Sequence, residues 1–259
     1  MRLLKENYDG LQEVGDLSYG LKRFLSEPDI QQALQKSDFS VIYEKVHIEL
    51  ASEFTQLMNS LNIDPLEHLN YIPNWFLSNT PIKSITIPTY IKRIGSGAFQ
   101  NCVYLTHITI PDSVIDIGTE AFAYCKGLTS IIIPDSVISI SHGCFRNCTY
   151  LASVTLTNNI TTISSSVFEN CRALNSIVIP EGVTSIGYQA FLGCDNLTSI
   201  TIPGSVINIG SEVFSYCKKL KEITYEGTKS DWNKIVKLYS WDSLSSIKTI
   251  HCIDREINL

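Results

Sequence analysis

The sequence has few charged residues and no long apolar run. Lys, Arg, Asp and Glu make up only 18% of its 259 residues, and the formal net charge is −6. A chain of negative charge has no general electrostatic attraction for the phosphates of nucleic acid or of an anionic membrane. No apolar run approaches the roughly 20 residues that a membrane-spanning helix needs. We therefore expect no direct binding to nucleic acid and no membrane association.

The short motifs of common catalytic and metal sites are also missing. The five histidines show no HxxxH or HExxH spacing, no two cysteines have the CxxC spacing, and GxSxG does not occur. His107 is expected on an exposed strand, where a single histidine is more often a contact residue than a catalyst. The sequence therefore predicts no enzyme, no catalytic residue, no metal and no cofactor.

The first twenty residues hold no recognisable export signal. Arg2 and Lys5 are basic, but no apolar segment follows them. Without export, the eight cysteines are expected to be reduced thiols, buried as small apolar groups. These features predict a cytoplasmic protein.

Charge is distributed unevenly along the chain. Residues 1–80 contain six Lys or Arg and twelve Asp or Glu, whereas residues 81–259 contain fourteen of each. The whole negative excess therefore belongs to the N-terminal third, which we treat as a separate functional surface.

A repeat of 23 residues dominates the rest of the sequence. Each unit has a cysteine, a phenylalanine three residues before it and a leucine three residues after it. The cysteines are Cys102, Cys125, Cys148, Cys171, Cys194 and Cys217. Six consecutive units without insertion or deletion predict a solenoid, because one unit cannot bury its own apolar face.

One unit, residues 105–125, reads LTHITIPDSVIDIGTEAFAYC. Its first part alternates and predicts a short strand with Ile108 and Ile110 pointing inward. VIDIG predicts a second extended stretch, and TEAFAYC a helical or turn-like segment. With the imperfect end units included, we expect a parallel sheet of about eight short strands, near residues 85, 108, 131, 154, 177, 200, 223 and 250.

The pattern LxxIxIPxxVxxIGxxAFxxC resembles the BspA-type leucine-rich repeat, over about residues 80–259. The resemblance implies an α/β repeat solenoid, wound as a right-handed coil, that serves as a binding surface. Such repeats are common in bacterial surface proteins, most of which carry an export signal. The resemblance therefore implies an alternative function as a cell-surface adhesion or carbohydrate-binding protein.

Four regions are expected along the chain. They are an acidic helical domain (1–60), a degenerate capping repeat (61–82), six repeats (83–226) and a C-terminal cap (227–259).

The ends of the array predict specific local features. In the degenerate repeat, Asn79 lies 23 residues before Cys102 and is expected to replace a cysteine. In the C-terminal cap, Ser230 is expected to cap a short helix. In the acidic domain we expect one helix from Pro28 to Leu34, and a longer amphipathic helix from about residue 38 to 61.

The outward strand positions form the main candidate binding site, on the concave face of the solenoid. They are Ser84, Thr86, His107, Thr109, Ser130, Ile132, Ser153, Thr155, Ser176, Val178, Ser199 and Thr201. This face is nearly uncharged and lacks the close titratable pairs that acid–base catalysis needs. Strand propensity and cross-strand pairing explain hydroxylated residues equally well, so a binding role and a structural role both stay open.

A second candidate surface lies on the acidic N-terminal domain. Its residues are Asp38, Glu44, Glu49 and Glu53. Acidic side chains would steer the protein toward a basic protein partner. Exposed tyrosines in the turns, such as Tyr104 and Tyr150, offer a third surface.

Together these observations predict a non-enzymatic protein-binding module. It would act inside the cell by occlusion or scaffolding, as a monomer or a weak homo-oligomer. One version is an inhibitor, for example phage-encoded, of a host defence protein or a nucleic-acid-handling protein.

Overall fold

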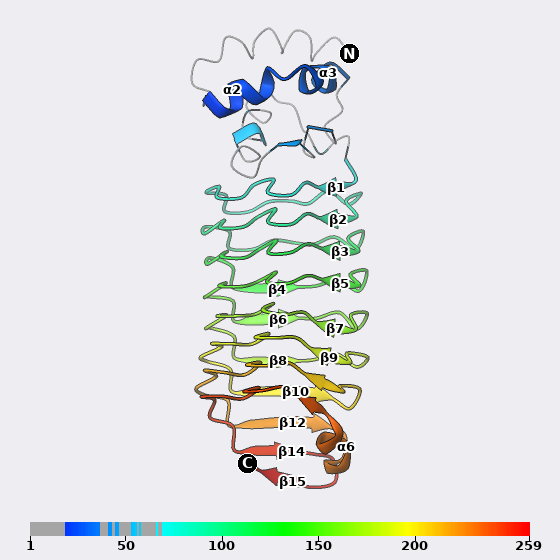
Figure 1. Ribbon diagram of the computed structural model, residues 1–259, viewed down its shortest axis with the longest axis vertical. Helices are drawn as coiled ribbons and strands as arrows, with labels where there is room; N and C mark the ends of the chain where they lie inside the picture. Colours follow the sequence, from blue (N-terminus) through cyan, green and yellow to red (C-terminus); the bar gives the residue numbers. More distant parts are fainter. Residues whose placement is uncertain are drawn as a thin grey trace.

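The chain forms a stack of coils with helices at one end. The computed structural model describes residues 19–36, 41, 42, 45, 46, 53–55, 57, 66 and 69–259. Helices α2 (Tyr19–Leu25) and α3 (Pro28–Lys36) lie beyond the first coil, and the C-terminal strands lie at the opposite end (Figure 1). The predicted solenoid is therefore confirmed.

A parallel sheet runs along one side of the stack. Its strands are β4 (Ser130–Ile132), β6 (Ser153–Thr155), β8 (Ser176–Val178), β10 (Ser199–Pro203), β12 (Glu222–Glu226) and β14 (Thr249–His251). Each has an alternating pattern, with Ile131, Ile177 and Ile200 buried as predicted for inward positions. The expected strands near residues 85 and 108 are reduced to one bridge, between Thr86 and Thr109. There the two coils stay aligned, since the Thr106 N–H donates to the Lys83 carbonyl at 3.1 Å, but the ladder is too short to form strands.

A second series of two-residue strands runs down the stack beside the first sheet. These strands are β1 (Tyr71–Ile72), β2 (Arg93–Ile94), β3 (Asp116–Ile117), β5 (Ser139–Ile140), β7 (Thr162–Ile163), β9 (Ser185–Ile186), β11 (Asn208–Ile209) and β13 (Val236–Lys237). They correspond to the second extended stretch expected from VIDIG. Figure 1 shows the two series side by side down the stack.

The coil formed by residues 151–173 is irregular. The first sheet is interrupted between β6 and β8, and the second series between β5 and β7. In this coil Thr157 stands where neighbouring coils have proline, and Ser164, like Ser141 in the coil before it, stands in the column of Gly187. The Gly187 N–H donates to the carbonyl of Ile163, whereas Ser164 contacts the carbonyl of Ile140 through its hydroxyl. Thr157 thus coincides with the break in the first sheet, and the two serines Ser141 and Ser164 coincide with the break in the second series.

The remaining part of each coil consists of tight turns and contains no helix in the repeats. Two positions per coil have a positive φ, with φ of 53–61° at the first and 58–69° at the second. The first column is Gly97, Glu120, Gly143, Ser166, Gln189 and Glu212. The second column is Asn101, Tyr124, Asn147, Asn170, Gly193 and Tyr216. Of the helical and turn-like alternatives for this segment, the turn is the one observed.

The core is built from columns of identical side chains. Six phenylalanine rings, from Phe99 to Phe214, stack with centroids 5.3–5.8 Å apart and planes within 19° of parallel. Five thiols each donate to the carbonyl of the phenylalanine in the preceding coil, for example Cys148 to Phe122 at 3.1 Å; they are those of Cys125, Cys148, Cys171, Cys194 and Cys217. The thiols therefore link neighbouring coils.

The N-terminal capping repeat has a different register from the predicted one. β1 pairs with β2 so that Tyr71 lies opposite Arg93, a step of 22 residues rather than 23. The Cys102 thiol donates to the Leu77 carbonyl at 3.0 Å and lies 3.5 Å from the Thr80 hydroxyl. Thr80, not Asn79, therefore takes the cysteine position, and Asn79 occupies the exposed positive-φ position instead. The prediction for Asn79 was wrong because the cap is one residue shorter than a repeat.

The C-terminal cap contains helix α6 (Lys229–Lys234) and strand β15 (Glu256–Asn258), which is antiparallel to β14. The helix begins after Thr228, whose hydroxyl accepts from the Asp231 N–H at 3.1 Å. The expectation that Ser230 is the cap was wrong, because Thr228 and Asp231 form a reciprocal capping box. Trp232 and Ile235 are buried as predicted.

Lys237 ends one of the inward columns. It lies opposite Ile209 in the pairing of β13 with β11, so a lysine stands where earlier coils have isoleucine. Its ammonium group lies 4.6 Å from the centre of the Trp232 ring and donates to the carbonyls of Trp232 and Ile235. Burial lowers the pKa of Lys237.

The N-terminal region agrees only in part with the helices expected there. α3 begins at Pro28 as predicted, but α2 was not anticipated. Residues 41, 42, 45, 53–55 and 57 are helical, whereas Val46 lies in a bend, so the single continuous helix expected here was wrong. In the part of the chain that the structure describes, no helix has the length and apolar character needed to cross a membrane.

Candidate functional site

The structure brings the predicted strand residues together on one face, here called the strand face. Eleven of the twelve are exposed, and Thr201 is half-buried. Ser130 lies opposite Ser153, Ile132 opposite Thr155, and Val178 opposite Thr201. The side chains thus form two rows that run along the stack.

Most of the strand face is uncharged. Its exposed apolar residues are Ile132, which is 70% exposed, and Val178, which is 66% exposed. His107 lies beside the Thr106 hydroxyl at 3.2 Å and takes part in no ion pair among the described residues. The face therefore offers hydroxyl groups, β-branched surface and little charge.

Charge appears on this face at its C-terminal end. Nε2 of His251 lies 3.3 Å from the Glu222 carboxylate, and its Nδ1 lies 3.1 Å from the Glu256 carboxylate. The three residues come from β14, β12 and β15, so this cluster fastens the last strand to the sheet.

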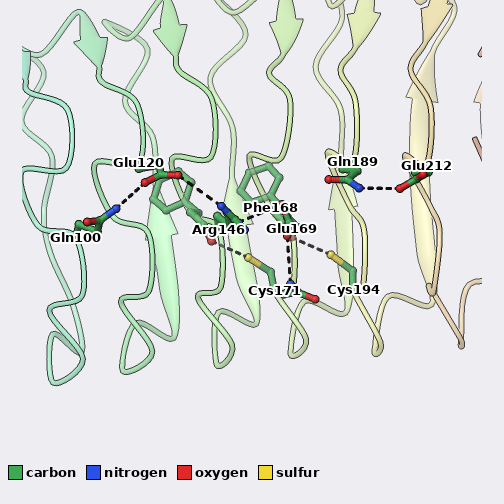
Figure 2. Close-up of polar contacts among 11 residues, drawn as sticks. Gln100, Glu120, Arg146, Phe168, Glu169, Cys171, Gln189, Cys194 and Glu212 are labelled. Atoms are coloured by element: carbon green, nitrogen blue, oxygen red, sulfur yellow. Dashed lines mark hydrogen bonds and ion pairs between the residues drawn. The ribbon is translucent and has the colours of Figure 1, made fainter.

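Polar side chains on the turn side bind mainly to one another. Figure 2 shows Gln100 donating to the Glu120 carboxylate, at 2.6 Å, and Gln189 donating to that of Glu212, at 2.7 Å. Arg146 lies between two carboxylates, 3.6 Å from Glu120 and 3.2 Å from Glu169. These contacts join consecutive coils, so the turn side uses its charges internally.

A depression of about 600 Å³ lies on the strand face beside the irregular coil. It is lined by residues of three consecutive coils, among them His107, Asp112, Ile132, Asp135 and Leu156. No sequence motif predicted this depression. Thr157 in place of proline was the available signal, because proline ends the strand in the neighbouring coils.

A second depression, of about 580 Å³, lies along the short strands β1, β2 and β3. Here the Arg93 guanidinium lies 5.5 Å from the centre of the Tyr71 ring. Arg93 therefore already covers part of the aromatic surface that a ligand would use.

The acidic candidate surface is only partly open to a structural test. Asp38, Glu44 and Glu49 lie outside the described residues, and Glu53 is half-buried. The exposed tyrosines expected in the turns are present, with Tyr104 58% and Tyr150 66% exposed.

Cysteine chemistry is suppressed by burial. All cysteines except Cys252 are buried. Burial raises the pKa of Cys148 and of Cys217 to about 12. A thiol with a raised pKa stays protonated and is a poor nucleophile and metal ligand. Among the described residues, no group of three or more His, Cys, Asp or Glu side chains is arranged to hold a metal ion.

Solved structures of leucine-rich repeat proteins share this fold. A leucine-rich cell surface protein from Faecalibacterium prausnitzii has 36% identity and a TM-score of 0.52, over 62% of this chain and 52% of that one. A T. pallidum leucine-rich repeat protein has 31% identity and a TM-score of 0.54, over 57% and 70%. A leucine-rich repeat protein from Eubacterium ventriosum has 26% identity and a TM-score of 0.57, over 69% and 46%.

The chain thus spans about half the length of the Faecalibacterium and Eubacterium chains. No curated protein matches it. The family model described as "BspA type Leucine rich repeat region" matches residues 41–151, 69–197 and 115–235, so the matches extend over most of the sequence. Together with the coil geometry, this match shows that the chain belongs to the BspA-type leucine-rich repeat family.

Proposed function

We propose that the chain is a non-enzymatic protein-binding module that uses its strand face. The observation that carries this proposal is the contrast between the two sides of the coil. Turn-side charges such as Arg146 and Glu169 are paired with each other, whereas Ile132 and Val178 are left exposed on the strand face. An exposed, ordered apolar residue within a hydroxyl-rich surface is a favourable centre for a protein interface.

The stacked core supports this mode of action. The phenylalanine column and the thiol–carbonyl hydrogen bonds hold successive coils in one arrangement. The strand face is therefore ordered before any partner binds. A pre-organised surface loses little conformational entropy on binding. The module would act by covering or by bridging its partner and not by turnover.

Position-specific photo-crosslinking in the native cells tests the proposal. A photoreactive residue is placed at Thr155, on the strand face, or at Tyr150, an exposed turn position that serves as the matched control. We expect discrete protein adducts from Thr155 that disappear when Ser130→Arg is added, and none from Tyr150. Adducts from Tyr150 alone, or from neither position, would overturn the proposal.

The similarity to a cell surface protein favours a second candidate, adhesion at the cell surface. The acidic N-terminal third instead supports the narrower proposal of a cytoplasmic inhibitor with a basic partner, such as a host defence or nucleic-acid-handling protein. Protease treatment of intact cells separates the two. Cleavage of the chain before lysis supports adhesion, and complete protection supports the cytoplasmic version.

A further inference from the structure

The depression on the strand face combines apolar surface with unpaired negative charge. Its volume is about 600 Å³, and Ile132, Leu156, Asp112 and Asp135 are among the residues that line it. Its lining runs from residues 107–110 across β4 to β6, and β6 is the strand that borders the interruption before β8. This part of the face is therefore chemically distinct from the hydroxyl rows around it.

The apolar part of the depression follows from the irregular coil. Leu156 occupies an inward strand position, and its counterparts Ile133 and Ile179 are buried. Leu156 itself is only half-buried, and its coil is the one whose strand β6 is not paired with β8. Together with Ile132 it presents aliphatic surface that nothing in the described part of the chain covers.

The charge of the depression has one sign. Asp112 and Asp135 follow Pro111 and Pro134 and occupy equivalent positions in adjacent coils, about 5 Å apart by strand spacing. Both are exposed, and neither forms an ion pair with a Lys or Arg of the described residues. No Lys or Arg lines the depression. Two neighbouring carboxylates repel each other, and a cation placed between them removes that repulsion.

We propose that this depression binds an extended segment of the protein partner that presents an arginine or lysine beside an aliphatic residue. The cationic group lies between Asp112 and Asp135, and the aliphatic group packs on Ile132 and Leu156. A long basic side chain suits both surfaces, since its alkyl stem packs on apolar atoms while its charged end reaches the carboxylates. The inference rests on the proposed function and adds the chemistry of the partner.

Two displayed libraries of peptides of about ten residues, one with a fixed central arginine and one with a fixed central glutamate, provide the probe. Both libraries are selected for binding to the full-length chain. The best arginine peptide is then measured by fluorescence polarisation with the wild type, with Asp112→Asn/Asp135→Asn and with Glu181→Gln. Glu181 is the matched control, because it follows Pro180 at the same position of a coil outside the depression.

We expect enrichment from the arginine library only. The Asp112→Asn/Asp135→Asn variant should weaken binding about tenfold or more, and Glu181→Gln less than about twofold. Ile132→Ser should also weaken binding about tenfold. Raising the salt to about 0.3 M should weaken wild-type binding more than binding by the double Asp variant. Circular dichroism confirms that each variant is folded.

Failure of this inference is distinguishable from failure of the proposed function. Equal enrichment from the glutamate library, or full binding by the double Asp variant, overturns the basic-partner inference. If the Thr155→Arg variant nevertheless fails to bind those peptides, the strand face remains the binding surface. If no selected peptide is sensitive to Thr155→Arg or Ile132→Ser, both proposals are wrong.

Discussion

The two sides of each coil differ in what their side chains contact. On the turn side, phenylalanine, cysteine and the Gln–Glu–Arg contacts connect each coil to the next. On the strand face, the side chains of rows such as Ser130 and Thr155 project into solvent, and outside the His251 cluster the coils are connected there mainly by the backbone. Stability is therefore concentrated in the turn side and interior, and we expect substitutions on the strand face to change the free energy of unfolding little.

Loss of one ring from the phenylalanine column is the strongest test of this difference. Phe145 is fully buried between Phe122 and Phe168, at centroid distances of 5.5 and 5.8 Å. Phe145→Ala should lower the free energy of unfolding by about 3–5 kcal/mol, measured by urea denaturation. Ile132→Ala on the strand face is the control, with a change below about 0.5 kcal/mol. Equal losses in the two variants would contradict the comparison.

Alkaline pH tests the interior thiols. Burial raises the pKa of Cys148 from 9.0 to about 12, so the folded thiol stays protonated where the unfolded thiol ionises. The contribution of this thiol to stability is complete below about pH 9 and is lost as the pH rises toward 12. Between about pH 8 and pH 10, the wild type should lose about 1.4 kcal/mol more than Cys148→Ala.

Urea denaturation of both proteins at each pH measures that difference. Cys252→Ala is the control, because Cys252 is only half-buried and its pKa is raised less. An identical pH dependence of the wild type and Cys148→Ala would show that the thiol ionises as easily in the folded protein.

A smaller effect is expected from the ion pairs between coils. Glu169 is 8% exposed and lies 3.2 Å from Arg146, so Glu169→Gln removes the negative charge beside a partly buried guanidinium. We expect a loss of about 1 kcal/mol in thermal or urea unfolding. Glu212→Gln is the matched control, since its new amide oxygen still accepts from Gln189 and stability should hardly change.

The smallest effect is expected in the hydroxyl row. Ser130 and Ser153 are exposed and lie opposite each other across β4 and β6. The double variant Ser130→Ala/Ser153→Ala should change the free energy of unfolding by less than about 0.5 kcal/mol, while the adducts from Thr155 should weaken. A loss comparable to that of Glu169→Gln would instead assign these hydroxyls a structural role.

The repeat was predictable because each coil buries the same apolar positions against its neighbours. Strands near residues 131, 154, 177, 200 and 223 lie where alternation and the 23-residue step place them, and the strand near residue 250 follows after the longer step of 27 residues. The identity of the strand-face residues follows directly, because strand positions alternate between core and solvent. The comparison with known proteins supports the family and the fold, and the binding role of these residues stays a prediction.

The structure departs from the prediction in coils whose length or sequence differs from that of the neighbouring coil. The N-terminal cap advances by 22 residues, so counting by 23 selected Asn79 in place of Thr80. Thr157 and Ser164 were visible as substitutions, but the opening of the sheet and the exposure of Leu156 depend on how two neighbouring coils pair. Such effects come from contacts between coils, which a single repeat does not encode.

Lys237 determines how an array of this kind can change in length. A coil appended after β13 would stack its inward isoleucine on an ammonium group that already bonds Trp232 and Ile235. An inward charge of this sort protects the edge of a sheet from further pairing. A duplicated unit of 23 residues inserted between two interior coils meets the same phenylalanine, cysteine and positive-φ positions on both sides. The strand face can therefore be lengthened from within the array, whereas growth at this end requires Lys237 to be replaced first.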